Sequence, residues 1–161
     1  MMSMAGKLKA GFFSFTGDEG CMVTVLEAIS SHFAEWSGKL DIAFWKVLRS
    51  RDWIDEDMDV AIVEGAISSY EEEERLKHLR EHCKVLVAVG SCAITGAPSN
   101  HRNFFDERRL GEIADFLHRF DYREKVQPLK DFVKVDYEVQ GCPVDEAGFV
   151  KLMEKLLSGG A

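Results

Sequence analysis

Short, almost continuously apolar runs alternate with amphipathic segments along most of this chain of 161 residues. Strands that are apolar on both sides need a layer of helices over each face of their sheet. The alternation therefore predicts an α/β fold with a central parallel sheet of four to five strands. We expect strands over 9–15, 40–47, 58–63 and 85–89, and a short one near 133–137. Helices are expected over 21–36, 69–82, 106–120 and 145–157.

The length of the chain sets the expected number of domains. At 161 residues it is close to the commonest domain size. It contains no internal repeat and no low-complexity linker that would separate two units. We therefore expect a single domain over residues 1–161.

The charge and hydropathy of the chain argue against two classes of partner. The net charge is −8, and there is no basic stripe that could release counterions from nucleic acid. No apolar run approaches the roughly 18 residues that span a membrane, and the apolar part near the N-terminus is too short for a signal peptide. We expect a cytoplasmic protein with no nucleic-acid partner and no direct membrane span.

Three of the four cysteines follow predicted strands. Cys21 lies in the turn after the first strand, Cys92 follows the fourth, and Cys142 follows the last strand-like run. The carboxyl ends of parallel strands meet at one edge of the sheet, where such folds bind their ligands. We therefore expect these three thiols to converge. Cys83 begins the fourth strand instead, and we expect it to be a core thiol.

Converging thiolates indicate a soft metal centre. Cysteine sulfur selects iron–sulfur clusters or zinc, and neighbouring glycines let the backbone approach inorganic atoms closely. There is no CxxC pair, but Asp18 stands three residues before Cys21 and would place an oxygen ligand beside the three sulfurs. A cysteine after a strand is also common as a small buried side chain, and a loop aspartate also caps helices. The spacing alone leaves both interpretations open.

Four segments of the chain follow one another in an order that resembles a known family. They are residues 16–21, 63–68 (VEGAIS), 87–100 (VAVGSCAITGAPSN) and 139–146 (VQGCPVDE). They resemble the small subunit of nickel–iron hydrogenases and the related iron–sulfur subunit beside the quinone site of respiratory complex I. The resemblance implies a flavodoxin-like, three-layer αβα domain with one 4Fe-4S cluster. The ligands that it implies are Asp18, Cys21, Cys92 and Cys142.

Asp18 is where this chain departs from the family pattern, because most members have a cysteine at that position. Some deazaflavin-reducing hydrogenases of methanogens resemble this chain in having an aspartate there. The fourth ligand implied by the resemblance is therefore Asp18, the adjacent Glu19 or solvent. Cys21 is followed by Met22 rather than by a second cysteine, which favours the hydrogenase branch over the complex I subunit.

The resemblance also implies a role in an oxidoreductase complex. A subunit of this kind is not catalytic itself. It passes single electrons between the nickel–iron site of a large subunit and further iron–sulfur or flavin subunits. The chain has no paired cysteines that could anchor nickel, in keeping with an active centre on the partner. Ile94, Phe104 and Phe105 are expected at an apolar interface with the partner. Glu64 is expected either to line the partner contact or to bond loop amides at its strand end. His101 and Arg102 are expected either at the free surface or against the large subunit.

Other functions stay possible on the residues alone. Residues 14–17 resemble the phosphate loop of flavodoxins, which would make the chain an FMN-binding electron carrier, but Asp18 and Glu19 would repel a phosphate dianion. A subunit that kept the fold and lost its cluster would serve only in assembly, and the missing fourth cysteine is consistent with that role. Zinc on three cysteines and one aspartate is also chemically possible.

Overall fold

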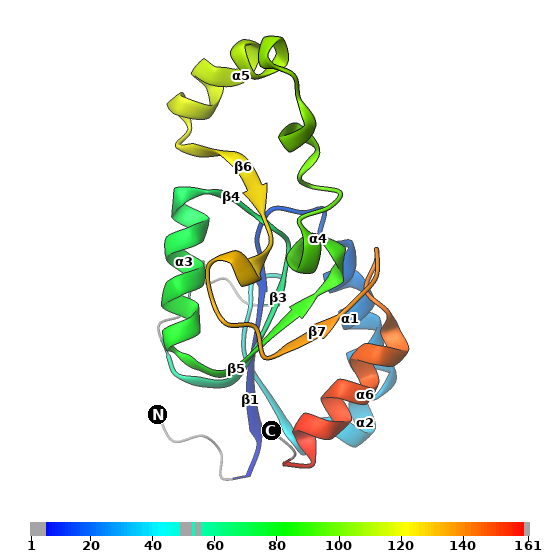
Figure 1. Ribbon diagram of the computed structural model, residues 1–161. Helices are drawn as coiled ribbons and strands as arrows, with labels where there is room; N and C mark the ends of the chain where they lie inside the picture. The colour runs from blue at the N-terminus through cyan, green and yellow to red at the C-terminus, as the bar shows by residue number, and fades with distance from the viewer. Residues whose placement is uncertain (1–5, 49–52, 54–55, 160–161) are drawn as a thin grey trace.

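The computed structural model describes residues 6–48, 53 and 56–159 (Figure 1). Its central sheet consists of the strands β1 (Leu8–Ser14), β2 (Leu40–Trp45), β3 (Met58–Glu64), β5 (Cys83–Val89) and β7 (Tyr137–Val139). They lie in the order β2–β1–β3–β5–β7, and every neighbouring pair is parallel. Counted along these five strands, this is the 2-1-3-4-5 order of flavodoxin-like domains. The predicted fold class is confirmed.

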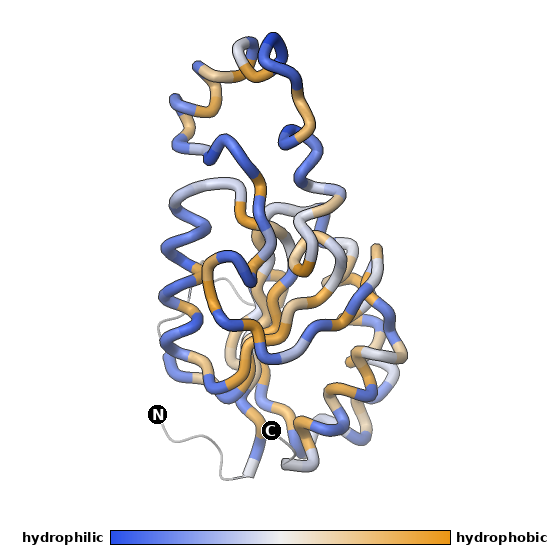
Figure 2. Tube along the Cα trace, viewed as in Figure 1, coloured by the Kyte–Doolittle hydropathy of each residue, from blue (hydrophilic) through white to orange (hydrophobic). Residues whose placement is uncertain are grey.

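Helices cover both faces of the sheet (Figure 1). One face carries α1 (Gly20–Ser31), α2 (Phe33–Trp36) and α6 (Glu146–Leu157), and the other carries α3 (Tyr70–Glu81) and α4 (Gly90–Thr95). The buried side chains accordingly form two clusters, with Val25 and Phe149 in the first and Leu76 in the second. Figure 2 shows hydrophobic residues concentrated along the central strands. These two clusters form the core.

The alternation of side chains explains why the strands are apolar throughout. In β1, Ala10 and Phe12 join the cluster under α1 and α6, whereas Phe13 joins the cluster under α3. In β3, Ile62 joins the cluster under α1 and α6, and Val63 joins the cluster under α3. Successive side chains of a strand point to opposite faces, so a sheet that is covered on both faces needs apolar residues at nearly every position.

Short polar side chains fix the starts of the helices. At α3 the Ser69 hydroxyl accepts a hydrogen bond from the Glu72 amide, and the Glu72 carboxylate accepts one from the Ser69 amide, which forms a capping box. At α6 the Asp145 carboxylate accepts from the Gly148 amide. The predicted helices are confirmed, except that the first is divided at His32 into α1 and α2.

Residues 96–127 form an extension, here called the arm, that rises from the sheet at the top of Figure 1. It contains a short 3-10 turn, η1 (His101–Phe104), and the helix α5 (Glu107–Arg119), none of whose side chains is buried. The arm returns through β6 (Tyr122–Gln127), which pairs antiparallel with β4 (Ile67–Ser69) in a separate two-stranded sheet.

Some of these elements differ from the sequence-based expectation. Strands β4 and β6 and the helix α4 were not expected. Only Val126 of β6 is buried, so that strand has no apolar run, and α4 spans only six residues, too few for a helical period. The last strand of the sheet begins at Tyr137 rather than near 133, because the chain after the 3-10 turn η2 (Leu129–Asp131) stays irregular up to Asp136.

The described helices are short. The longest of them, α5, has 13 residues. Within the part of the chain that the structure describes, no helix is long and apolar enough to cross a membrane.

Candidate metal centre

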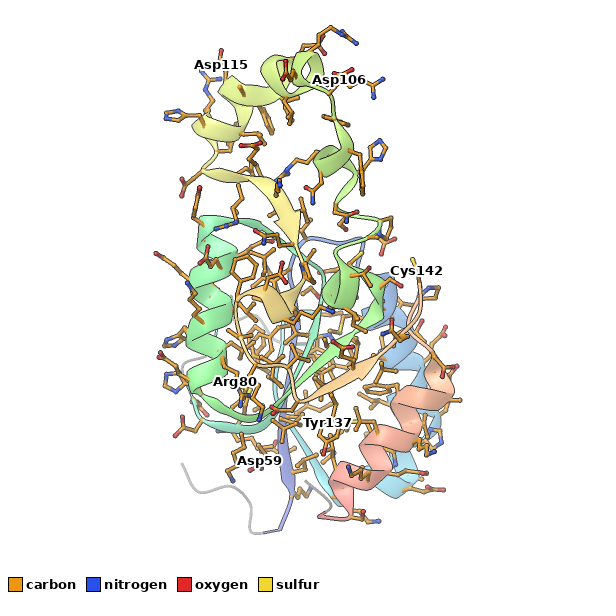
Figure 3. The ribbon with its side chains drawn as sticks, viewed as in Figure 1. Asp59, Arg80, Asp106, Asp115, Tyr137 and Cys142 are labelled. Carbon is orange, nitrogen blue, oxygen red and sulfur yellow. The ribbon has the colours of Figure 1, made fainter. Side chains whose placement is uncertain are left out.

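A cavity of about 830 Å³ opens at the carboxyl edge of the sheet, and all four predicted ligands line it. Cys21 lies in the first turn of α1, just after the loop that follows β1. Cys92 lies in α4, which follows β5 directly, and Cys142 lies in the turn after β7. The predicted convergence of the three thiols is thus confirmed, while their role as ligands stays a prediction. Figure 3 shows Cys142 at this edge, at the tip of its turn, and Asp59 at the opposite end of the sheet.

Gly90 allows the Cys21 sulfur to approach the end of β5. A Cβ atom built on Gly90 would lie 2.3 Å from the Sγ atom of Cys21, closer than atoms in contact can come. The φ angle of Gly90 is +85°, which side-chain-bearing residues rarely adopt. Both observations require glycine at this position, where β5 passes directly into α4.

A backbone hydrogen bond joins the start of α4, which carries Cys92, to the turn that carries Cys142. The Ser91 amide donates to the Gly141 carbonyl at 2.8 Å. Gly141 has a φ angle of +124°, and a Cβ atom there would lie 2.5 Å from the Pro143 carbonyl oxygen. This glycine lets the turn bend sharply enough to bring Cys142 to the rim of the cavity.

Asp18 and Glu19 lie on different sides of their loop. Asp18 lines the cavity with the three thiols, and one of its carboxylate oxygens accepts a hydrogen bond from the Gly20 amide at 2.9 Å. Glu19 instead lines a separate hollow of about 150 Å³, next to Phe12 and Trp45. Of the two carboxylates considered as the fourth ligand, Asp18 is the one placed with the cysteines.

Burial raises the pKa of the Cys21 thiol to about 11. A hydrogen bond from the Val144 amide opposes the shift, and negative charge on Glu64, Cys92 and Cys142 adds to it. Free Cys21 is therefore protonated at neutral pH, and binding of a metal to its sulfur would release a proton. The charges of Cys92 and Cys142 affect the pKa of Cys21 because the three thiols lie close together.

Glu64 ends β3 beside this site and is only 3% exposed. Its Oε2 atom accepts a hydrogen bond from the Met22 amide at 3.0 Å. Burial raises the pKa of its carboxyl group against the opposing hydrogen bonds from Met22 and Ser14, and the charges of Glu19 and Asp18 raise it further. The carboxylate thus ties the end of β3 to the first turn of α1.

Ser99 is a neighbour of the predicted ligands that the sequence analysis did not single out. Its Oγ atom lies 3.2 Å from the Sγ atom of Cys92, and it lines the same cavity. The contact depends on the path of the turn between the two residues, which leaves no periodic or compositional signal in the sequence.

Several residues expected near a partner have other surroundings. Ile94 belongs to α4, is 2% exposed and packs into the apolar cluster beside α3. Its predicted place at an interface is wrong, because α4 packs onto the sheet and buries this side chain. Arg102 donates within the chain, to the carbonyls of Ser68 and Arg123. Phe104 is 75% exposed and stays available to a partner.

The structure confirms that Cys83 is a core thiol. It is 8% exposed and pairs with Met58 at the amino ends of β5 and β3, away from the cavity. The Nη1 atom of Arg80 donates to its sulfur at 3.3 Å. This cysteine therefore takes no part in the candidate metal centre.

Three cysteine sulfurs and one carboxylate are a donor set that an iron–sulfur cluster can use. Among the described residues, no group of three or more His, Cys, Asp or Glu side chains is arranged to hold a metal ion. A four-iron cluster takes one protein ligand on each iron, so its ligands stand further apart around a roomy cavity. Three soft sulfurs and one oxygen around about 830 Å³ suit that arrangement.

Three donors of the loop that resembles a flavodoxin phosphate cradle already have partners within the chain. The amides of Phe15 and Thr16 donate to the carbonyls of Glu64 and Ala66. The Thr16 hydroxyl lies 2.5 Å from the Ser68 hydroxyl and donates to the Glu72 carboxylate at 2.9 Å. These two amides and the Thr16 hydroxyl are therefore already engaged within the chain, and FMN binding is not favoured.

Comparison with known proteins shows similarity to hydrogenase subunits over most of the chain. The chain is 27% identical, over 94% of its length, to the G subunit of the F420-non-reducing hydrogenase vhu of Methanocaldococcus jannaschii, of which it spans 57%. It is 29% identical, over 96% of its length, to the delta subunit of the NAD-reducing hydrogenase HoxS of Cupriavidus necator, of which it spans 80%. Several of these relatives are thus considerably longer than this chain.

Solved structures agree with the sequence comparison. A chain of an NAD+-reducing NiFe-hydrogenase in its H2-reduced state matches with a TM-score of 0.74 and 28% identity, over 96% of this chain and 93% of that one. The Ni-Fe-Se hydrogenase of Desulfomicrobium baculatum shares the fold, with a TM-score of 0.64 and 17% identity over 94% of this chain and 62% of that one. The sequence profile described as NADH ubiquinone oxidoreductase, 20 kDa subunit, matches residues 19–156. The chain therefore belongs to this family, which confirms the resemblance inferred from its four motifs.

Proposed function

We propose that this chain is the electron-transfer subunit of a nickel–iron hydrogenase complex and binds one 4Fe-4S cluster in the thiol-lined cavity. The observation that carries the proposal is the gathering of Asp18, Cys21, Cys92 and Cys142 around one cavity. Support comes from the similarity over 96% of the chain to a subunit of an NAD-reducing hydrogenase. The single domain over residues 1–161 and a cytoplasmic location are parts of the same proposal.

The residues around the cavity have distinct tasks in this proposal. Cys21, Cys92 and Cys142 would supply sulfur ligands and Asp18 an oxygen ligand. A bound cluster of this kind supplies single-electron transfer. Cys21 and Cys92 are half-buried and Cys142 is exposed, so the protein body would shield one side of the site from water. The open side, at Cys142, is where electrons would enter or leave.

The partner would be the large subunit that carries the nickel–iron centre. Further iron–sulfur or flavin subunits would take the electrons onward. In this arrangement hydrogen is split on the partner and not on this chain. The alternative of a cluster-less assembly subunit rests on Asp18 standing where most members have cysteine, and measurement of bound iron separates the two.

The test is to purify the complex anaerobically with its native partners and to measure iron, sulfide and the EPR spectrum after dithionite. Wild type is compared with Cys92→Ala and with the matched control Cys83→Ala, since Cys83 is a buried thiol away from the cavity. We expect Cys92→Ala alone to lose about four irons per chain, the content of one cluster, together with the corresponding EPR signal. Unchanged iron and signal in Cys92→Ala would refute the cluster.

A further inference from the structure

We propose that the Ser99 hydroxyl donates a hydrogen bond to the ligand sulfur of Cys92 and thereby raises the reduction potential of the bound cluster. This inference rests on the proposed function. It assigns Ser99 a tuning role without making it a ligand.

The two side chains are within hydrogen-bonding distance across the turn that follows α4. The Ser99 Oγ atom lies 3.2 Å from the Cys92 Sγ atom, and both residues are half-buried and line the cavity. A polar contact of this kind, partly shielded from water, is stronger than the same contact on an open surface.

Hydrogen bonds elsewhere in the turn place Ser99 independently of its contact with the sulfur. The Gly96 amide donates to the Cys92 carbonyl at 2.9 Å, and the Asn100 amide donates to the Gly96 carbonyl at 2.8 Å. The Thr95 hydroxyl donates to the Ser91 carbonyl at 2.9 Å and accepts from the Ala97 amide at 3.2 Å. These hydrogen bonds fix the backbone of the turn and so place the Ser99 hydroxyl next to the Cys92 sulfur.

Ligation determines which atom donates. A free Cys92 thiol and the Ser99 hydroxyl can each donate to the other, because both carry a hydrogen. Once Cys92 binds metal as a thiolate its sulfur has no hydrogen, so only the hydroxyl can donate.

The direction of the effect follows from charge. Reduction adds an electron, and the sulfur ligands carry part of the added negative charge. A hydrogen bond to an atom strengthens as that atom becomes more negative, so the hydroxyl stabilises the reduced state more than the oxidised state. Hydrogen bonds to the sulfurs are among the known determinants of iron–sulfur potentials.

The experiment is an EPR-monitored redox titration of the anaerobically purified complex. The variants are Ser99→Ala, which removes the donor, and Ser99→Thr, which keeps a hydroxyl. Ser91→Ala is the matched control, because Ser91 lines the same cavity, while the hydroxyl found at the Cys92 sulfur is that of Ser99. We expect Ser99→Ala to lower the ratio of reduced to oxidised cluster at a fixed potential by up to about tenfold. For a one-electron couple that is about 59 mV.

The outcomes separate this inference from the proposed function. Absence of iron and EPR signal in the wild type would remove both. With the cluster present, an unchanged potential in Ser99→Ala would overturn the role of Ser99 alone. An equal shift in Ser99→Thr or in Ser91→Ala would also overturn it, because loss of packing would then explain the effect.

A second measurement serves if Ser99→Ala fails to retain the cluster. Pulsed electron–nuclear double resonance on the reduced wild type, in H2O and in D2O, detects exchangeable protons near the irons. We expect a coupled exchangeable proton that keeps its coupling in Ser99→Thr and in Ser91→Ala. A wild-type spectrum without such a proton would contradict the proposed hydrogen bond.

Discussion

At the scale of single residues, the candidate centre depends on glycines as much as on its ligands. Gly90 leaves room for the Cys21 sulfur where a Cβ atom would lie 2.3 Å away. The convergence of the three cysteines could be predicted from the sequence, because each cysteine follows a strand and parallel strands end at one edge. The contact of Ser99 and the separation of Asp18 from Glu19 could not be predicted, since both depend on turn geometry.

Replacing Gly90 by alanine should damage both stability and the site. Its φ angle of +85° disfavours any side chain, which alone costs on the order of 1–3 kcal/mol, and the new methyl group would displace the Cys21 sulfur. We expect a lower melting temperature and a loss of bound iron, measured by calorimetry and iron analysis. Gly111→Ala is the control, because a Cβ atom there meets nothing within 4 Å. Equal effects in the two variants would contradict this account.

Asp18 can be tested against its neighbour. If its carboxylate binds iron, Asp18→Ala should alter the EPR spectrum of the reduced complex. The ligand that replaces the carboxylate would change the ligand field at that iron. Glu19→Ala should leave the spectrum unchanged, since Glu19 lines a different hollow. A spectrum altered only by Glu19→Ala would transfer the role to Glu19, and one altered by neither would leave solvent as the ligand.

At the scale of elements, the short strand β7 is held at its start by Asp136. The Asp136 carboxylate accepts a hydrogen bond from the Leu86 amide at 2.9 Å and pairs with Arg80 at 3.3 Å and with Lys134 at 3.1 Å. Its own amide donates to the Leu86 carbonyl at 2.9 Å. The long strands could be predicted because they are apolar on both faces. The short strand β7 was expected near 133–137, but its start at Tyr137 depends on this polar anchor and could not be predicted.

The anchor makes a pH-dependent contribution to stability. Burial would raise the pKa of Asp136, but the Leu86 amide, Lys134 and Arg80 outweigh burial and hold the pKa below its usual value. The stabilisation is therefore complete above the unfolded-state pKa of about 3.9 and is lost as the pH falls through the lower, folded-state pKa.

Asp136→Asn should lower the free energy of unfolding by about 1 kcal/mol at neutral pH, since it removes the charge but keeps an acceptor. The difference from wild type should shrink below about pH 4. Urea unfolding at several pH values measures it. Asp115→Asn, at an exposed position of α5, is expected to change stability by less than about 0.5 kcal/mol. A deficit for Asp136→Asn that stays constant through acid pH would contradict the electrostatic explanation.

At the scale of the whole molecule, the arm and the body differ in how they are held. The body has two apolar clusters around its sheet, whereas α5 buries no side chain. The base of the arm is held by polar contacts: Arg102 donates to the carbonyls of Ser68 and Arg123, and Asn103 exchanges hydrogen bonds with the backbone of Val126. The helix in the arm could be predicted from its period, but its position away from the body could not.

Amide hydrogen exchange should show that the arm and the body open in separate local unfolding reactions. Amides of α5 should exchange with far less protection than those of β3, because few buried contacts oppose local opening. Arg102→Gln should reduce the protection of β6 by about tenfold, the equivalent of about 1.4 kcal/mol of lost hydrogen bonding, and leave β3 unchanged. Arg108→Gln, which removes an exposed ion pair with Glu112, is the control. Equal losses in β3 and β6 would mean that arm and body open together.

The separation of the apolar clusters from the cavity has a consequence for how the protein is made. The two clusters close around the strands, while the thiols stand at the rim of the sheet and Cys142 is exposed. The apolar core can therefore form during synthesis before the proposed iron–sulfur cluster is bound. On the proposed function, the iron–sulfur cluster would enter from the side where Cys142 is exposed, after the apolar clusters have closed.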